Sequence, residues 1–329
     1  MRFVLFHLFM LAILIISGCS SNPVEHVWKE KGKEQSQLRE PFTGEPNEGE
    51  EEPAIMVMVN NQRQARPQTG LGQADLVVEM LAEGEITRFA AFYHSEKEGV
   101  VGPVRSLRPY YLDLAKGVGA VVAHAGGSPE AIRRVEKDEI ANLDGIKDAS
   151  RLFWREDFSP SPHNLYTDLA KLRQGAKQVG AEPDASVEGP WQFDPRGAAS
   201  KGKTAIKVNV RYNFLYDAGY RYDADSGKYI RYTQGEKQQD RKSKQPLAMD
   251  NVLVLYAKHQ TIDKAGRRDI DLKGKGTGYL FQKGKGIAVQ WENRNGWIVP
   301  LAEGKVASLL PGKTWINIMP EDGGLSFSE

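Results

Sequence analysis

The chain has 329 residues, which is enough for about two domains of ordinary size, and its 40% hydrophobic and 26% charged residues are typical of a globular protein. A formal net charge of +1 excludes a global field that would attract nucleic acid or anionic lipid, so any basic site must be local. The single cysteine excludes an intramolecular disulfide, and the fold must therefore be held by its core.

The first 19 residues have the pattern of a lipoprotein signal peptide. Arg2 gives a short positive region, residues 3–16 are apolar except for His7, and the stretch ends in Ile16-Ser17-Gly18-Cys19. This is too short for a spanning helix, which needs about 20 apolar residues. The order aliphatic, small, small, cysteine is that of a lipobox, which predicts a signal peptide over residues 1–18 and lipidation of Cys19.

Lipidation would anchor the protein to the outer, extracytoplasmic face of the cell membrane. Two or more acyl chains such as palmitate give stable anchoring. An exported protein without disulfides favours a Gram-positive source, of the Firmicute type. The alternative is an uncleaved N-terminal anchor helix in which the cysteine falls at this place by chance.

Four further regions are expected after the signal peptide. Residues 19–53 contain the lipidated cysteine and a disordered tether, because this polar segment cannot bury enough apolar surface to fold. Residues 54–180 form a mixed α/β domain, residues 181–200 a linker rich in Gly, Pro, Ala and Ser, and residues 201–329 a β-rich domain.

The expected α/β domain combines apolar runs of strand length with helical patterns. The strands are predicted at residues 55–59, 76–81, 87–93 and 120–123, and the helices at residues 107–116, 128–137 and 165–179. Ser128 followed by Pro129 is a typical helix start.

The second domain is expected to be an antiparallel barrel or sandwich, so that the fold class is α+β. Its strands are predicted at residues 205–210, 220–223, 229–232, 252–257, 278–282, 287–291 and 315–319. Residues 224–227 form a plausible hairpin turn. Six tyrosines of this domain could form an aromatic surface, but strand aromatics more often pack in a core. Trp191 and Phe193 of the linker are expected to dock on a neighbouring element.

An Arg-rich turn at residues 102–108 is the first candidate site. Ser106 could cap the following helix, whose first amides carry partial positive charge, and Arg105 and Arg108 add full charges. Such a combination suits a phosphate or a carboxylate. The alternative is that the arginines pair with Glu83, Glu85 or Asp113 as structural bridges.

The turn from His124 to Pro129 is the second candidate, because ligands of open α/β sheets bind where a strand hands over to a helix. Gly126 and Gly127 allow close backbone approach, although they could equally serve only a tight turn. A third polar group lies at residues 153–155 and 162–164. Together the three regions and Arg88 give one ligand-binding set: Arg88, Arg105, Ser106, Arg108, Gly126, Gly127, Ser128, Arg155 and Asn164.

Catalysis has weaker support from the sequence. His124 and His163 with Glu83 or Glu85 could act as acid and base groups, provided that they share one pocket. The sequence has no nucleophile-elbow motif, and no ligand spacing supports a metal. We therefore expect no metal and no cofactor, assign no catalytic residue, and lean against an enzyme.

Several motifs together resemble the family of YerB-like lipoproteins. In the first half these are Ala65-Arg66-Pro67-Gln68, Glu83-Gly84, Gly102-Pro103-Val104-Arg105-Ser106, His124-Ala125-Gly126-Gly127-Ser128-Pro129 and Pro162-His163-Asn164. In the second half they are Asp250-Asn251-Val252 and Pro311-Gly312-Lys313-Thr314-Trp315. The resemblance implies two domains and a lipid anchor, and it implies no reaction.

The expected function is accordingly a non-enzymatic binding or adaptor module at the membrane surface. Its partners would be the membrane, through the lipid anchor, and either a protein or an anionic ligand of the envelope, with no signature of nucleic-acid binding. The alternative is a hydrolase or transferase that acts on envelope polymers.

Overall fold

The computed structural model describes residues 38–329, apart from 48, 50–51, 148–150 and 183–188. The predicted signal peptide, Cys19 and the tether as far as residue 37 lie outside the described residues. All described residues belong to one compact unit. In this part of the chain, no helix is long and apolar enough to cross a membrane.

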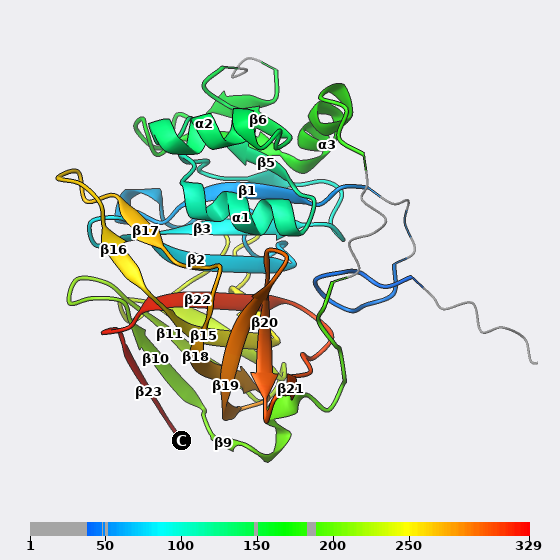
Figure 1. The fold of residues 1–329 in the computed structure, drawn as a ribbon, viewed down its shortest axis with the longest axis vertical. Helices are drawn as coiled ribbons and strands as arrows, with labels where there is room; N and C mark the ends of the chain where they lie inside the picture. The colour runs from blue at the N-terminus through cyan, green and yellow to red at the C-terminus, as the bar shows by residue number, and fades with distance from the viewer. Residues whose placement is uncertain (1–37, 48, 50–51, 148–150, 183–188) are drawn as a thin grey trace, which may run out of the picture. The chain divides into compact units, whose positions relative to one another are not determined.

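One large sheet forms the centre of the fold, and its strands follow one another from β19, β20 and β21 in the lower part of Figure 1 to β6 at the top. In spatial order they are β21 (Lys305–Val306), β20 (Trp297–Ala302), β19 (Lys285–Arg294), β18 (Lys275–Gln282), β15 (Asn251–Ala257), β22 (Thr314–Pro320), β2 (Leu76–Glu83), β3 (Ile86–Tyr93), β1 (Ile55–Asn60), β5 (Val121–His124) and β6 (Asn142–Asp144), with β9 (Lys203–Thr204) paired to β19.

Three smaller sheets and three α-helices complete the described structure. The smaller sheets contain β13 (Glu236–Lys237), β12 (Lys228–Thr233), β11 (Asp217–Asp223), β10 (Lys207–Arg211), β23 (Gly324–Ser328) and β14 (Ala248–Met249); β16 (His259–Thr261) and β17 (Arg268–Ile270); and β4 (Val100–Val101), β8 (Leu165–Asp168) and β7 (Phe153–Arg155). The helices are α1 (Pro109–Gly117), α2 (Pro129–Lys137) and α3 (Leu169–Gln178), with 3-10 turns at Arg63–Ala65 and Ala198–Lys201.

The central strands are buried on both faces, which explains their continuous apolar runs. Along β1, Met56 and Met58 join one hydrophobic core, whereas Ile55, Val57 and Val59 join the other. Side chains of successive strand residues point to opposite faces, so each strand supplies both cores.

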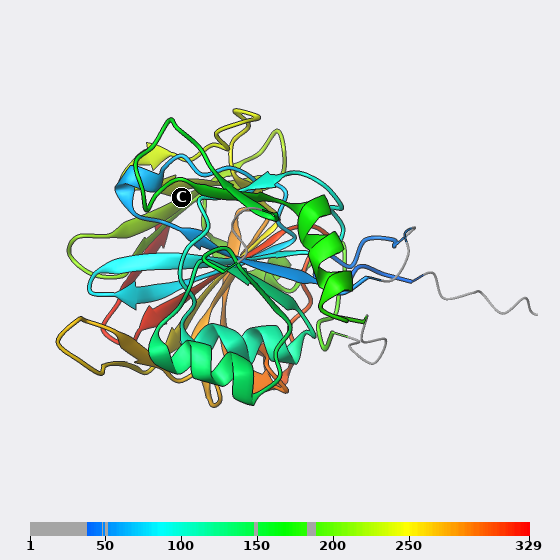
Figure 2. The ribbon, with the colours of Figure 1, turned by 90° about the horizontal axis from the view of Figure 1, so that it is seen from above.

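Different elements pack on the two faces of the large sheet. Helices α1 and α2, which contact each other, pack on the first face together with the β16–β17 hairpin. The sheet containing β10, β11 and β12, the β4–β8–β7 sheet and α3 pack on the second face. Figure 2 shows α1 and α2 side by side and α3 apart from them. The arrangement confirms the expected α+β class with a strand-rich second half.

The strands of the two expected domains share the large sheet. Strand β22, from the second half, runs parallel to both β15 and β2. The second half is thus a sandwich of two sheets rather than a purely antiparallel barrel. Trp191 of the expected linker docks as predicted, because its indole N–H donates to the Ile298 carbonyl at 2.8 Å and its ring meets Trp297 edge-on.

Two local predictions need correction. The third helix begins at Leu169 rather than Leu165, because residues 165–168 pair with β4 and β7 and the Asp168 carboxylate caps the helix at Ala170 N–H. The segment around Phe42, expected to belong to the tether, packs on the body, since Phe42 is buried against Phe92 and Trp297.

Candidate functional site

Six strands of the large sheet run in the same direction and end at one edge. Parallel pairs link β15, β22 and β2, and also β1, β5 and β6, while β3 runs antiparallel between β2 and β1. We call the region where these strands end the strand-end edge; its last strand residues are Ala257, Pro320, Glu83, Asn60, His124 and Asp144. Ligands of α/β sheets bind at such edges.

The two candidate turns of the sequence meet at this edge. The Leu107 N–H donates to the Gly126 carbonyl at 2.9 Å, and the Ser128 N–H donates to the Leu107 carbonyl at 3.2 Å. The starts of α1 and α2 therefore lie together, and both contribute partial positive charge. Ser128 caps α2 as predicted, since its hydroxyl accepts from Ala131 N–H at 3.3 Å.

Ser106 does not cap α1, contrary to prediction. Pro109 is the first residue of α1, so the N-cap position falls on Arg108, which makes no side-chain cap. Ser106 instead accepts, through its carbonyl oxygen, a hydrogen bond of 2.6 Å from the Arg88 guanidinium.

Arg88 and Arg108 are structural bridges. Their side chains are only 5% and 10% exposed, and both pair with the Glu83 carboxylate, Arg88 at 2.9 Å. Removing both guanidinium groups from water is tolerated because the carboxylate lies between them. These two arginines therefore form structural ion pairs, which was the alternative to a ligand-binding role. Two guanidinium groups and one carboxylate leave the group of Glu83, Arg88 and Arg108 with one excess positive charge.

Arg105 has a different environment. Its backbone is fixed between β1 and the residues after β5, by hydrogen bonds from Arg105 N–H to the Met58 carbonyl at 2.7 Å and from Ala125 N–H to the Arg105 carbonyl at 3.1 Å. Its side chain is half-buried and, among the described residues, has no ion pair or hydrogen bond, with Nε shielded from solvent. Burial, and then repulsion from Arg88, lower the pKa of Arg105.

His163 lies beside this guanidinium. Its Nδ1 is 2.9 Å from the amide nitrogen of Asn60, the last residue of β1, so Nδ1 accepts and carries no proton. Burial, and then the charge of Arg105, lower the pKa of His163. Next to it, Asn164 accepts from Arg155 at 2.8 Å and donates to the Glu156 carbonyl, so these two predicted ligand residues pair with each other.

His124 is not available for acid–base chemistry in this arrangement. Its side chain is 1% exposed, Nδ1 is 2.9 Å from the Gly126 carbonyl, and Nε2 is 3.2 Å from Asn142 Oδ1. Gly126 has φ +62°, and its N–H donates to the Asp144 carboxylate at 2.8 Å, so its turn needs glycine.

No contact joins His124 and His163 within the described structure. The other carboxylate candidate, Glu85, lies 3.7 Å from Arg268. In the same part of the chain, no three His, Cys, Asp or Glu side chains gather closely enough to hold a metal ion.

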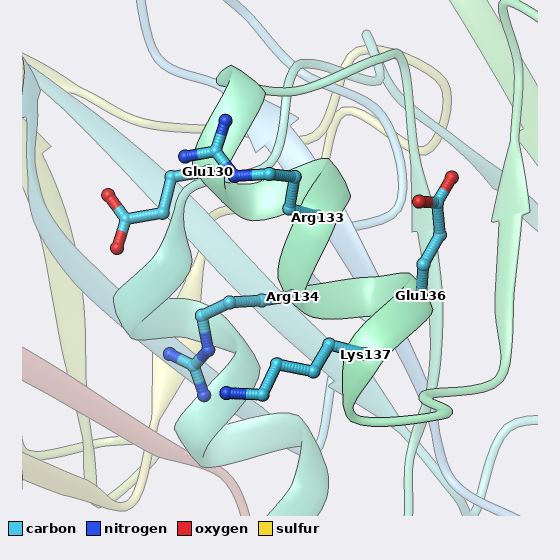
Figure 3. A pocket seen from close by; sticks show the side chains of 5 residues that line it. All are labelled: Glu130, Arg133, Arg134, Glu136 and Lys137. Atoms are coloured by element: carbon cyan, nitrogen blue, oxygen red, sulfur yellow. The ribbon is translucent and has the colours of Figure 1, made fainter.

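A surface hollow beside α2 offers no better site. It is lined by Glu130, Arg133, Arg134, Glu136 and Lys137 (Figure 3). All five belong to one helix and most are exposed, and the Arg134 guanidinium is already paired with Asp113 at 2.7 Å. This is the solvated face of an amphipathic helix.

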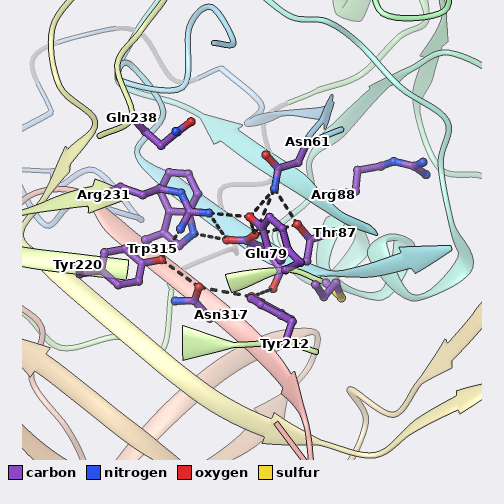
Figure 4. Close-up of polar contacts among 12 residues, drawn as sticks. Asn61, Glu79, Thr87, Arg88, Tyr212, Tyr220, Arg231, Gln238, Trp315 and Asn317 are labelled. Carbon is purple, nitrogen blue, oxygen red and sulfur yellow. Dashed lines mark hydrogen bonds and ion pairs between the residues drawn. The ribbon is translucent and has the colours of Figure 1, made fainter. Parts of the chain in front are cut away.

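A buried polar network around Glu79 was not predicted from the sequence. Glu79 of β2 is fully buried and pairs with Arg231 of β12 at 2.9 Å (Figure 4). The carboxylate also accepts from Tyr216 at 2.7 Å, from Thr87 at 2.9 Å and from the Trp315 indole at 3.2 Å. Attraction to Glu79 raises the pKa of Arg231 against the opposing effect of burial.

This network joins the two halves of the chain. Tyr212 donates to the Glu79 carbonyl at 3.1 Å, and Tyr220 donates to Asn317 of β22 at 2.9 Å. Four of the six second-half tyrosines, Tyr212, Tyr216, Tyr220 and Tyr229, are buried as core residues, whereas Tyr222 and Tyr232 are half-buried. A signal was present in the sequence, because a carboxylate inside the apolar run of residues 76–81 requires a buried partner.

Comparisons with known proteins agree on one family. Residues 42–182 match the N-terminal domain, and residues 208–316 the C-terminal domain, of the family described as "protein of unknown function (DUF3048)". The chain is 40% identical over 303 residues to the protein of Bacillus subtilis (strain 168) named "Putative lipoprotein YerB", with 89% of each sequence covered. The chain belongs to the YerB-like family.

The YerB-like fold is also known from experiment. A crystal structure of the YerB protein from Bacillus subtilis matches with a TM-score of 0.81 and 39% identity, covering 88% of this chain and 100% of that chain. Membership of the YerB-like family supports the lipoprotein nature predicted from the N-terminal residues. It names no ligand for the strand-end edge.

Proposed function

We propose that this YerB-like lipoprotein is anchored through Cys19 to the outer face of the membrane and that it binds an anionic envelope ligand, or an acidic group of a protein partner, without catalysis. The binding group is Arg105 at the strand-end edge. The observation that carries the proposal is a half-buried guanidinium that has no carboxylate among the described residues, beside two helix starts.

The surroundings of Arg105 favour an anion. The excess charge of the Glu83–Arg88–Arg108 group and the dipoles of α1 and α2 have the same sign as Arg105. A guanidinium that is partly removed from water and unpaired gains more from an anion than an exposed one does.

Substitution of single arginines tests whether Arg105 binds the anion. We expect Arg105→Ala to weaken binding of inorganic phosphate or a muropeptide at least tenfold in calorimetry. The control is Arg133→Ala, which removes an exposed guanidinium from the nearby helix α2. Equal affinities of the Arg105→Ala variant and the wild type would reject the proposed site.

The anchor has its own test. Cys19→Ala should release the protein from membranes or leave an unprocessed precursor, because the acyl chains have no other attachment in the lipobox model. Unchanged metabolic labelling of this variant with a fatty acid would reject lipidation at Cys19.

An envelope hydrolase or transferase using His124 and His163 has no support in this geometry. Both nitrogens of His124 are within hydrogen-bond distance of protein oxygens, and the ring is buried. We therefore do not propose a reaction.

A further inference from the structure

Two large apolar side chains project from the turn between β10 and β11. Phe214 is 86% exposed and Leu215 is 57% exposed. Phe214 is the most exposed of the large hydrophobic residues that the structure describes. Adjacent exposed apolar residues of this size mark an interaction surface more often than an isolated one does.

The turn is held in place although its apolar side chains are free. Asn213 accepts from the N–H groups of Leu215 and Tyr216, at 2.8 and 2.9 Å, and donates to the Glu85 carbonyl at 3.1 Å. Gln234 donates to the Leu215 carbonyl at 3.0 Å. A fixed backbone means that little conformational entropy is lost when Phe214 and Leu215 enter an apolar medium.

The turn lies at the strand-end edge, where β22 ends (Figure 1). Asn213 contacts Glu85 in the turn between β2 and β3. Glu83, the last residue of β2 before this turn, forms the ion pairs with Arg88 and Arg108. The apolar tip and the proposed anion site are therefore neighbours on one edge.

Among the described residues, charges of both signs without an ion pair lie at this edge, and the arginines outnumber the carboxylates: Arg63, Arg66, Arg105 and Arg211 against Asp217, Glu321 and Asp322. Arg63 and Arg66, at the end of β1, have no ion pair among the residues that the structure describes, and neither has Arg105. Arg66 donates to Gln234 at 3.0 Å, and Gln234 in turn holds the tip. The tip thus combines apolar and cationic groups, as surfaces that enter an anionic headgroup layer do.

The anchor makes contact of this edge with a membrane feasible. The described chain starts on the opposite side, where the Gly312 N–H before β22 donates to the Thr43 carbonyl. The 18 residues between Cys19 and Leu38 can extend over at most about 60 Å, whereas β22 spans only about 20 Å between the two edges. Tethering also raises the effective concentration of the tip at the membrane, so a weak contact becomes populated.

We infer that the strand-end edge docks on the membrane to which the protein is anchored, with Phe214 and Leu215 entering the headgroup layer of anionic phospholipids. The inference rests on the proposed anchor. A convex tip of two side chains is small beside the roughly 800 Å² that each partner buries in a stable protein interface, but it is sufficient for insertion between lipids.

The test places an environment-sensitive dye at the tip. The full mature chain carries Cys19→Ser and Leu215→Cys, labelled with nitrobenzoxadiazole. An N-terminal histidine tag holds it on nickel-chelating vesicles that contain about one third phosphatidylglycerol. We expect at least a twofold rise in fluorescence and quenching by doxyl-labelled lipids. The tag makes this outcome independent of whether Cys19 is acylated in the cell.

The control label is Asp225→Cys, in the turn at the other end of β11. It should stay in an aqueous environment. Equal signals at both positions would mean non-specific adsorption and overturn the inference, as would a tip label that stays aqueous on the vesicles. If the fluorescence of the tip label rises on protoplasts but not on vesicles, the tip contacts a protein, and this outcome would also reject docking on the lipid.

The Phe214 side chain is tested in the same assay. In the tagged chain held on the anionic vesicles and labelled at Leu215→Cys, the further substitution Phe214→Ser should at least halve the rise in fluorescence. Circular dichroism matching that of the parent shows that the variant folds. An unchanged rise with an intact fold would overturn the inference, and an equal rise of the parent on neutral nickel-chelating vesicles would overturn its electrostatic part.

Discussion

Glu79 and Arg231 together show how single residues determine the interior of this protein. Both are almost completely buried. Five side chains from both halves of the chain contact the carboxylate, namely Asn61, Thr87, Tyr216, Arg231 and Trp315. The run of residues 76–81 predicted the strand correctly. The partner was not predictable, since the pairing depends on the packing of β12, and Arg231 lies 152 residues after Glu79 in the sequence.

Removing one member of this pair leaves an uncompensated buried charge. We therefore expect Glu79→Gln to lower the free energy of unfolding by about 3–5 kcal/mol. Urea denaturation measures this, with Glu292→Gln as control, because the pair between Glu292 and Arg294 is exposed and contributes at most about 1 kcal/mol. A loss for Glu79→Gln as small as that of the control would contradict the assigned role.

The lowered pKa of His259 leads us to expect that the stability of the protein depends on pH. Burial lowers the pKa of His259, the Nδ1 hydrogen bond to the Ala257 carbonyl opposes this shift and the charge of Arg268 adds to it, so that the resulting pKa is about 4. The folded state therefore binds this proton less readily than the unfolded state does. The contribution of neutral His259 is complete above the ordinary pKa of about 6.5 and is lost as the pH falls towards 4.

The loss amounts to about 2 kcal/mol at pH 4.5. His259→Asn keeps a donor for the Ala257 carbonyl but cannot be protonated in this range. We expect the urea midpoint of the wild type to fall more steeply than that of the variant between pH 7 and 4.5. Parallel curves for the two proteins would show that another group causes the acid sensitivity.

At the scale of elements, a helix start and a turn with typical residues were predicted correctly, whereas a segment whose pattern fits both a helix and a strand was not. Ser128 with Pro129 marked the start of α2 correctly, and the turn at residues 224–227 joins β11 and β12 as expected. The start of α3 was placed too early, because Leu165 and Tyr166 fit either a helix or a strand until β4 and β7 are present. Of the candidate site, the motifs at Arg105 and Gly126 were found, but the pairing of Arg88 and Arg108 with Glu83 required the tertiary structure.

The cap of α2 supports the turn beside Arg105. Ser128→Ala should lower the free energy of unfolding by about 1 kcal/mol, because the Ala131 N–H loses its acceptor. Ser128→Asp restores an acceptor and adds negative charge at the helix start, so it should retain the stability of the wild type. Thermal denaturation of both variants checks the cap; equal losses for Ala and Asp would mean that the hydroxyl serves another contact.

At the scale of the whole molecule, the two sequence regions of the family share one sheet and both hydrophobic cores. Strand β22 completes the sheet between β2 and β15, and each hydrophobic core contains residues from both halves. The boundary expected near residue 180 divides the sequence into an α/β pattern and a β-rich pattern, but each hydrophobic core contains residues from both sides of it. Sequence patterns could not reveal this, because a parallel pairing between β2 and β22 leaves no local signature.

A shared sheet predicts a single unfolding transition for the described body. If Trp154 is retained as the only tryptophan in one variant and Trp291 in another, with the remainder changed to Phe, the two probes report on the first and second halves respectively. Within each variant, the urea midpoint from fluorescence should coincide with the midpoint from circular dichroism, because unfolding either half exposes the core of the other. A fluorescence midpoint that differs beyond error from the circular dichroism midpoint of the same variant would mean that the halves unfold independently, and that β22 contributes little to holding β2 in place.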